Sequence, residues 1–371
     1  MYFHDYNIVT PLGFDTASTT EEMLAGKTGI ALHSAFGQIK DVQLSVCDAE
    51  ATEEAFAKLG VKGVFSHLEK LLLLSAVPVL DRCAIGPHTA LILSTTKGNI
   101  SALGMGEELP YLNLLAEKIA KVLGITTTPI VVSNACVSGA MALSVAGRLL
   151  QGGVYENALV LAVDEVSEFV LSGFQSFQAM SATPCRPYDA QRDGINLGEA
   201  AAAVVVSCRR EGAVAELLGS SSINDANHIS GPSRTGEGLW RSVQCALAQA
   251  QLGADKIQLI NAHGTGTLYN DEMESIAFGR AGLLDVPLNS YKGYFGHTLG
   301  AAGLVETLLS IDFSRRDILL KSLNFSSLGV SQPINVLKET LRQRVRYLLK
   351  TASGFGGSNT ALVIKMLDND L

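Results

Sequence analysis

The sequence predicts an α/β fold whose strands are buried and mostly parallel. Short apolar runs rich in β-branched residues alternate with helical stretches, and the 371 residues are 47% hydrophobic but only 17% charged. Strands covered by helices on both faces form continuous apolar runs, and alternation of strand and helix is typical of parallel sheets. We therefore expect strands at residues 89–95, 130–133, 158–163, 201–207, 215–221, 258–262 and 361–366.

The strand at residues 130–133 leads into a helix that begins at Cys136. The following residues are apolar around most of the circumference, which predicts a central buried helix. Gly152 and Gly153 end it, because glycine accepts the left-handed conformation of helix C-termini. A helix N-terminus favours a thiolate, so we expect a lowered pKa for Cys136. Taken alone, such a cysteine is more often a buried structural residue.

Two histidines lie in glycine-rich segments further along the chain. His263 follows an apolar strand and precedes Gly264, which places it at the carboxyl end of a strand, where α/β sheets bind ligands. His297 lies among small residues that open another helix. Each alone could be a loop or helix-cap residue. Together with a thiol, two imidazoles could hold an acyl thioester and stabilise an enolate oxygen.

A polar break at residues 207–212 divides the chain near its middle. We place the boundary of two similar halves there, at residues 1–210 and 211–371. The first carries Cys136, and the second carries both histidines. Long linkers and low-complexity tracts are absent from the sequence, so we expect the halves to pack as one rigid body.

Composition excludes several classes of protein. The net charge of −8 disfavours nucleic acid binding. The apolar run near residues 71–80 is far shorter than the ~20 residues of a membrane span. The first residues lack an export signal, so we expect a cytoplasmic protein. Six cysteines without C-x-x-C spacing argue against a zinc site or a disulfide framework, and the apolar excess favours burial against a second subunit.

Five segments, in this order, resemble the β-ketoacyl-acyl carrier protein synthases, the Cys/His/His condensing enzymes of fatty acid and polyketide synthesis, in their elongating class. They are residues 132–139 (VSNACVSG), 186–194 (RPYDAQRDG), 261–267 (NAHGTGT), 292–300 (KGYFGHTLG) and 354–359 (GFGGSN). The resemblance implies the thiolase fold, a five-layered αβαβα arrangement built from two similar halves.

The resemblance also implies roles for individual residues. Cys136 would carry the acyl group, and His263 and His297 would donate hydrogen bonds to the malonyl thioester oxygen as carbon dioxide leaves. Lys292 and Glu306 would support His297 and hold its tautomer. The family needs neither a metal nor a redox cofactor for this chemistry.

The GFGG loop would complete the site. By resemblance, the N–H groups of Phe355 and Cys136 form an oxyanion hole, and the Phe355 ring gates the acyl pocket. Gly354 and Gly356 would let that backbone approach the thioester. Phe174 matches a residue that lines the substrate pocket, although an ordinary core position is equally compatible with it. Two further carboxylates, Asp271 and Glu274, would brace the His263 loop.

The chain also departs from the family pattern. The usual first strand with a Gly-x-Gly turn is reduced to its tail at residues 7–13, and the N-terminal half is shortened. Ser353 stands where a second Phe is usual, and residues 198–201 read GEAA in place of GEGA. These changes indicate an unusual acyl chain, and the shortening makes a heterodimer with a related subunit plausible beside a homodimer.

We therefore predict decarboxylative Claisen condensation of a Cys136-bound acyl group with malonyl-acyl carrier protein, in fatty acid or polyketide and polyene synthesis. A thiolase would need a second cysteine late in the chain, and none follows Cys245. Initiating condensing enzymes use Asn where His297 stands, and a cysteine hydrolase would not need His297, Lys292 and the GFGG loop together. The alternative is a chain-length-determining partner subunit, which shares the fold but usually lacks the nucleophile.

Overall fold

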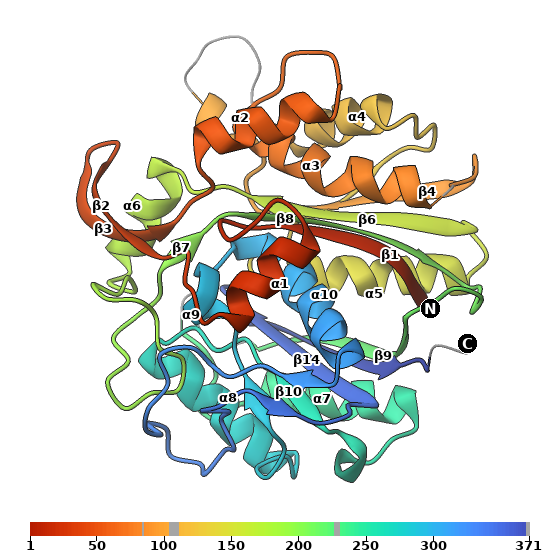
Figure 1. The fold of residues 1–371 in the computed structure, drawn as a ribbon. Coiled ribbons are helices and arrows are strands. Elements are labelled where there is room, and N and C mark those ends of the chain that lie inside the picture. The colour runs from red at the N-terminus through yellow and green to blue at the C-terminus, as the bar shows by residue number, and fades with distance from the viewer. Residues whose placement is uncertain (84, 104–110, 226–230, 369–371) are drawn as a thin grey trace.

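The computed structural model describes residues 1–83, 85–103, 111–225 and 231–368. In Figure 1, helices and sheets alternate in five layers from top to bottom. The outer helices α2 (Ala49–Lys58), α3 (His67–Arg82) and α4 (Leu112–Val122) cover the first sheet, and α7 (Glu237–Ala250) and α8 (Leu268–Arg280) cover the second. Between the sheets lie α5 (Ser138–Gln151) and α10 (Ala302–Arg315). This is the predicted αβαβα order.

The two sheets repeat one strand order. The first runs β5 (Ile130–Val132), β4 (Thr89–Ser94), β6 (Asn157–Asp164), β8 (Ala200–Ser207), β1 (Tyr2–Val9). The second runs β11 (Leu288–Asn289), β10 (Leu259–Asn261), β14 (Tyr347–Gly354), β15 (Ser358–Met366), β9 (Ala215–Asn224). They join at the edge through Tyr2 with Glu216 and Phe3 with Ala215.

Strand direction corrects one expectation. In each half the first three strands are parallel, but β8 and β15 run antiparallel to both neighbours, so the sheets are mixed and not mostly parallel. All seven predicted strand segments contain strands. The direction of β8 could not be recognised, because its two faces are both buried and its apolar run therefore looks like that of a parallel strand.

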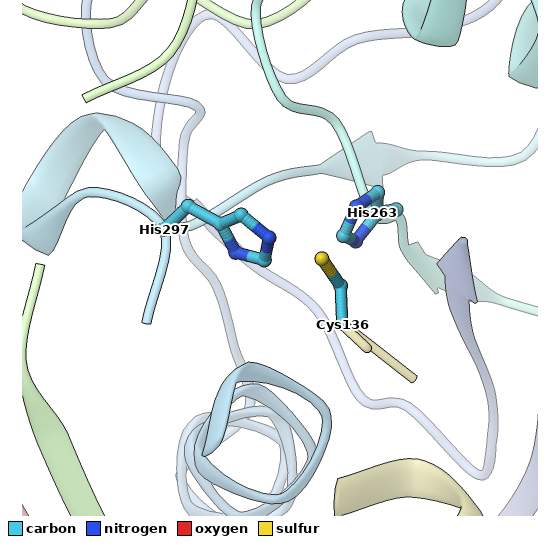
Figure 2. Close-up of side chains that lie close together, drawn as sticks. All are labelled: Cys136, His263 and His297. Carbon is cyan, nitrogen blue, oxygen red and sulfur yellow. The ribbon is translucent and has the colours of Figure 1, made fainter. Parts of the chain in front are cut away.

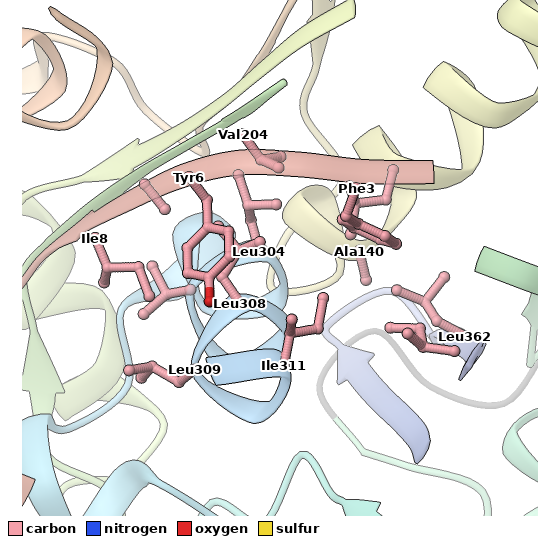
Figure 3. Close-up of a cluster of buried hydrophobic side chains, with 14 of the residues drawn as sticks. Phe3, Tyr6, Ile8, Ala140, Val204, Leu304, Leu308, Leu309, Ile311 and Leu362 are labelled. Atoms are coloured by element: carbon pink, nitrogen blue, oxygen red, sulfur yellow. The ribbon is translucent and has the colours of Figure 1, made fainter. Parts of the chain in front are cut away.

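Alternate residues of the first sheet feed separate cores. On β8, Ala202, Val204 and Val206 face the central helices, whereas the residues between them face the outer helices. Figure 3 shows the central core, where Tyr6 lies over Leu304 and Leu308 of α10 and Phe3 lies next to Ala140 of α5. This period of two is the side-chain alternation of a strand. The strands are therefore buried on both faces, as the sequence predicts.

Two glycines let the central helices touch. A Cβ atom on Gly139 of α5 would lie 2.5 Å from the amide nitrogen of Leu304, and one on Gly303 of α10 would lie 2.4 Å from that of Ala140. Contacts this short do not occur with a real side chain, so the two main chains pack directly on each other. The N-terminal ends of α5 and α10, which follow Cys136 and His297, therefore lie together.

Smaller elements complete the chain. A three-stranded sheet comprises β2 (Ala31–Phe36), β3 (Ile39–Ser45) and β7 (Leu197–Gly198), and β12 (Ile318–Leu319) pairs with β13 (Leu341–Arg342). The remaining α-helices of the described residues are α1 (Thr16–Leu24), α6 (Glu168–Ser176) and α9 (Lys292–Phe295). Among the described residues, no helix combines the length and apolarity that a membrane crossing requires. The division at residues 210 and 211 stays a prediction.

Candidate active site

Cys136 lies in a tight turn between β5 and α5. Ala135, directly before it, has a φ of +44°, a left-handed conformation that residues with a side chain rarely adopt. The Ser138 hydroxyl accepts a hydrogen bond from the Asn134 N–H at 2.7 Å and donates one to the Ala135 carbonyl at 2.6 Å. These bonds stabilise the strained turn and place the Cys136 side chain near the start of α5.

His263 lies in the turn that follows β10. Glu274 of α8 accepts hydrogen bonds from the N–H groups of His263 at 2.9 Å and Gly264 at 2.7 Å. Asp271, one turn earlier on α8, accepts one from the Thr265 N–H at 3.0 Å. Both carboxylates are fully buried, and they brace the turn as the sequence predicts.

His297 lies between α9 and α10, and its backbone is held from the first half of the chain. Its N–H donates to the Asn196 carbonyl at 2.8 Å, and its carbonyl accepts from the Gly198 N–H at 3.0 Å. Asp164, at the end of β6, accepts from the Gly300 N–H at 2.7 Å. Sequence reasoning missed Asp164, because an acidic residue after an apolar strand is also typical of an exposed loop.

The three predicted side chains meet. The Cys136 sulfur and one ring nitrogen each of His263 and His297 lie within 4.8 Å of one another. The ring centroids are 5.1 Å apart, with the ring planes at 83°. Figure 2 shows the sulfur between the two rings. Atoms at this spacing are close enough to contact one substrate oxygen or one small ion together.

Both imidazoles are neutral hydrogen-bonding groups. Burial, with the positive charge of Lys292, lowers the pKa of His263 and of His297 well below the usual value. Nδ1 of both rings and Nε2 of His297 are buried without a hydrogen-bond partner among the described residues. Buried polar atoms are rarely left unpaired, so these nitrogens are available to a bound group.

The pKa of Cys136 contradicts the expectation from the helix terminus. Burial raises it to about 11, although the charge of Lys292 and the N–H of Phe355 both lower it. The side chain is only 8% exposed, and the cost of removing a thiolate from water exceeds what Lys292 and the nearby N–H groups return. Cys136 is therefore a thiol at neutral pH, and the expectation of a lowered pKa is wrong.

Lys292 and Glu306 form a buried ion pair of 2.6 Å beneath the site. The second hydrogen bond of Lys292 goes to the carbonyl oxygen of His263, also at 2.6 Å. These two bonds therefore support the backbone of His263, whereas the sequence predicts support of His297. A third charged group, Lys350, shares the carboxylate of Glu306 and was not predicted.

The GFGG loop, between β14 and β15, passes Cys136 closely. A Cβ atom on Gly354 would lie 3.1 Å from the Cys136 amide nitrogen. The Phe355 ring packs between Phe174 and Phe177, with ring centroids 5.6 Å and 5.3 Å away. Phe177 was not predicted, since a half-exposed aromatic residue after a helix has no distinctive pattern.

A cavity of 360 Å³ joins these parts. Cys136, both histidines, Phe174, Gly354 and Phe355 line it, whereas Gly356 does not, contrary to its predicted place in the pocket. Ser353 also lines the cavity, and its hydroxyl donates to Asn359 at 2.9 Å. The position where the family usually has Phe is thus small and polar.

Two family models match successive parts of the chain. The beta-ketoacyl synthase N-terminal domain matches residues 82–211, and the C-terminal domain matches residues 214–326. The chain belongs to the beta-ketoacyl synthase family. The first match begins only at residue 82, in agreement with a shortened N-terminal part.

Two relatives, from different bacteria, are both called 3-oxoacyl-[acyl-carrier-protein] synthase 2. The chain is 35% identical over 252 residues to 3-oxoacyl-[acyl-carrier-protein] synthase 2 of Rhizobium meliloti strain 1021, covering 63% of this chain and 60% of the relative. It is 28% identical over 336 residues to the synthase 2 of Vibrio harveyi, covering 86% and 78%. The aligned part thus spans less than two thirds of the first of these relatives.

Solved structures share the fold over nearly the whole chain. A ketosynthase from Xenorhabdus doucetiae, in complex with its chain length factor, superposes with a TM-score of 0.85 at 25% identity, covering 99% of this chain and 98% of that one. The ishigamide ketosynthase/chain length factor gives a TM-score of 0.88 at 22% identity, with 99% of both chains covered. These neighbours establish the thiolase-fold ketosynthase architecture.

Proposed function

We propose that this chain is a 3-oxoacyl-acyl carrier protein synthase that joins a Cys136-bound acyl group to malonyl-acyl carrier protein with loss of carbon dioxide. One observation carries the proposal: two neutral imidazoles with unpaired, buried nitrogens face a thiol in a shared cavity. A pair of neutral donors suits an oxygen that gains negative charge during reaction. A cysteine hydrolase would need only one of these two imidazoles.

In the first half-reaction, the Cys136 sulfur attacks the thioester carbonyl of the acyl carrier protein. The carbon–sulfur bond to the carrier breaks, and the proton of the thiol passes to the departing carrier thiolate. Because the thiol has a raised pKa, it must lose this proton as it attacks, and a neutral ring nitrogen can accept it. The N–H groups of Cys136 and Phe355 would hold the oxyanion, and movement of the Phe355 ring would admit the acyl chain to a pocket lined by Phe174 and Gly354.

In the second half-reaction, malonyl-acyl carrier protein occupies the cavity. His263 and His297 donate to its thioester oxygen while the carboxylate leaves as carbon dioxide. The resulting enolate carbon attacks the acyl carbonyl on Cys136, a carbon–carbon bond forms, and the Cys136 thiolate is expelled and takes a proton from water. Lys292 and Glu306 hold the backbone of His263 in position during these steps.

The proposal includes the partners. Acyl carrier protein delivers both substrates, and a second ketosynthase-fold chain, identical or related, covers part of the surface. The Xenorhabdus doucetiae neighbour, solved with its chain length factor, supports a heterodimer. The same neighbour favours one alternative role, that of the chain-length-determining subunit, although Cys136 and both histidines are present here. We also propose that the protein acts in the cytoplasm.

The deciding experiment incubates the purified protein with acyl and malonyl carrier proteins, without any partner chain. Intact mass spectrometry follows the acyl group on the protein, and carbon dioxide release is measured in parallel. Loading on Cys136 followed by a β-ketoacyl product is the expected result. A protein that stays unacylated with every chain length tested, alone and with candidate partner chains, would refute the proposed catalytic role and favour the chain-length subunit.

A further inference from the structure

Lys350 is a buried lysine that the proposed reaction does not use. It lies within β14, where it pairs with Asn261 of β10 on one side and Leu362 of β15 on the other. Its side chain is 0% exposed. Moving an ammonium group out of water costs several kcal/mol unless partners compensate, so lysine is rarely found inside a central strand. Packing alone does not explain this position.

Its ammonium group has three oxygen acceptors. The Nζ atom lies 2.6 Å from Oε2 of Glu306, 2.8 Å from the Thr351 carbonyl oxygen and 3.5 Å from that of Ala262. The other oxygen of Glu306 accepts from Lys292, which also donates to the His263 carbonyl. One carboxylate thus holds two lysines, and these meet two consecutive carbonyls, of Ala262 and His263, at the end of β10.

The opposite side of the same peptide units is also held. Glu274 accepts from the N–H groups of His263 and Gly264, and from the hydroxyl of Thr351, the neighbour of Lys350. Carbonyl and N–H groups around His263 are therefore both bound by buried charges. Without Lys350, Oε2 of Glu306 would have no donor among the described residues, and a buried charged acceptor without a donor is strongly destabilising.

Charge distribution gives the lysine a second effect. Around the two rings the described charged and titratable groups include those that share hydrogen bonds or the cavity with them: Cys136, Asp164, Arg192, Asp193, Asp225, Tyr269, Asp271, Glu274, Lys292, Glu306 and Lys350. Asp271 and Glu274 are occupied by backbone N–H groups, and Asp271 lies 3.7 Å from Arg192. Among the described carboxylates, Glu306 is the one that is hydrogen-bonded to both lysines, so this trio carries excess positive charge. After burial, the charges of Lys292 and Lys350 lower the pKa of both His263 and His297.

We propose that Lys350 is a second positioning lysine of this active site, which acts through Glu306 and the end of β10 to orient His263 and to place positive charge beneath the enolate oxygen. The inference rests on the proposed condensation, because it assigns the charge to that oxygen. Lys350 does not touch the reacting atoms. Unlike Lys292, it lies within a strand, and two of its three acceptors are the main-chain carbonyls of Thr351 in β14 and of Ala262 at the end of β10.

The test compares Lys350→Met, which keeps the length of the side chain but not its charge, with Leu349→Ala. Leu349 is the adjacent buried residue of β14 and belongs to the outer core, so this control lowers stability without changing charge. Histidine ring nitrogens are followed by NMR in protein carrying ¹⁵N-labelled histidine, from about pH 5 to 8, around the usual histidine pKa of about 6.5. His263→Ala and His297→Ala assign the signals.

In Lys350→Met we expect the pKa of His263 to rise toward the usual histidine value, while Leu349→Ala leaves it unchanged. We also expect kcat for decarboxylation of malonyl carrier protein to fall roughly 10- to 100-fold at constant KM. An unchanged His263 titration together with an unchanged kcat would overturn the proposal. If Lys350→Met does not fold, Lys350→Gln replaces it, and failure of both beside a folded control would assign Lys350 a structural role only.

These readouts separate the two proposals. If the wild-type protein releases no carbon dioxide from malonyl carrier protein, the proposed function fails, but the NMR titration still decides whether Lys350 acts on His263. If the wild type is active and the variant titrates and reacts normally, only the inference about Lys350 fails.

Discussion

The two halves of the molecule have the same strand order but bury different charges. Where β6 of the first half ends, Asp164 is satisfied by N–H and hydroxyl groups of Thr95 and Thr96 and by the Gly300 N–H. The equivalent strand of the second half, β14, contains Lys350, and Lys292 lies close by, so the two buried lysines of the described residues both belong to this half. The first half thus supplies a protonated thiol, and none of its described lysines is buried. The second supplies two buried histidines whose pKa is lowered first by burial and then by the positive charges of Lys292 and Lys350.

The two halves of a repeated fold can carry different reactive groups of the same reaction. The helices α5 and α10 are equivalent elements, and the turns before them carry Cys136 and His297. Each half therefore offers one reactive side chain at the same structural position. The third group, His263, lies two residues past the end of β10, and the corresponding position past the end of β4 in the first half is Thr96. The difference predicts that each half can be disabled separately.

The largest effect is expected for Cys136→Ala. Without the thiol no acyl enzyme forms, so condensation should fall by at least about 10³-fold, because covalent catalysis is lost entirely. Intact mass spectrometry after incubation with acyl carrier protein measures the loading. Cys245→Ala, at an exposed cysteine of α7, is the control and should load normally. Normal loading of Cys136→Ala would place the nucleophile elsewhere.

The second-largest effect is expected when either histidine of the second half is removed. His263→Ala and His297→Ala should each lower the rate of malonyl decarboxylation by about 10²- to 10³-fold, the usual cost of removing one donor to an oxyanion. Acyl loading of Cys136 should fall less, because in each variant the remaining imidazole can still accept the thiol proton. The control is His33→Ala on β2, outside the cavity lining. Equal losses in both half-reactions would contradict a division of labour between the halves.

A smaller effect is expected for Glu274→Gln. The substitution replaces one carboxylate oxygen with an NH₂ group, which is itself a donor. His263, Gly264 and Tyr188 all donate to this side chain, so the NH₂ group would face a donor and lose that hydrogen bond. We expect about 1–3 kcal/mol of lost stability, measured by denaturant unfolding, and a decarboxylation rate about 10-fold lower. Glu272→Gln, two residues earlier on the same helix and on a different face of it, is the matched control. If both variants behave alike, Glu274 does not position His263.

The smallest expected effect is on the pH dependence of Cys136 alkylation. Because burial raises the pKa of Cys136 to about 11, alkylation of this residue should keep increasing about tenfold per pH unit above pH 9, whereas a small model thiol levels off near its own pKa of about 8.5. The sign follows from the reactive species: more thiolate forms as pH rises. Peptide mass spectrometry resolves Cys136 from the other cysteines. A plateau below pH 8 would show that the helix N-terminus outweighs burial.

Sequence patterns predicted the fold far better than they predicted the charges. Apolar runs located the strands, and the motifs around Cys136, His263 and His297 located the site, because side chains that face a core or a cavity are limited in type. The strand β1 was missed as a strand, since residues 2–9 mix polar and apolar residues without regular alternation.

Lys350 shows why the remainder could not be predicted. A lysine in a strand pattern is normally an exposed residue, and only the fold reveals that Glu306, on a different element, lies within 2.6 Å. The pKa of Cys136 is a similar case. The helix terminus is visible in the sequence, but the opposing effect of burial depends on how closely the Gly354 loop and both imidazoles cover the sulfur.

The contact of Gly139 with α10 and of Gly303 with α5 has a consequence for how the site withstands its surroundings. The helices meet through their main chains, so neither side-chain rotamers nor ion pairs determine how far apart their first turns lie. Salt, pH and the identity of the acyl chain act on side chains and leave such a contact unchanged. The separation between the thiol and the imidazole of His297 should therefore be the least adjustable dimension of the active site, while the walls of the cavity can vary between relatives without altering it.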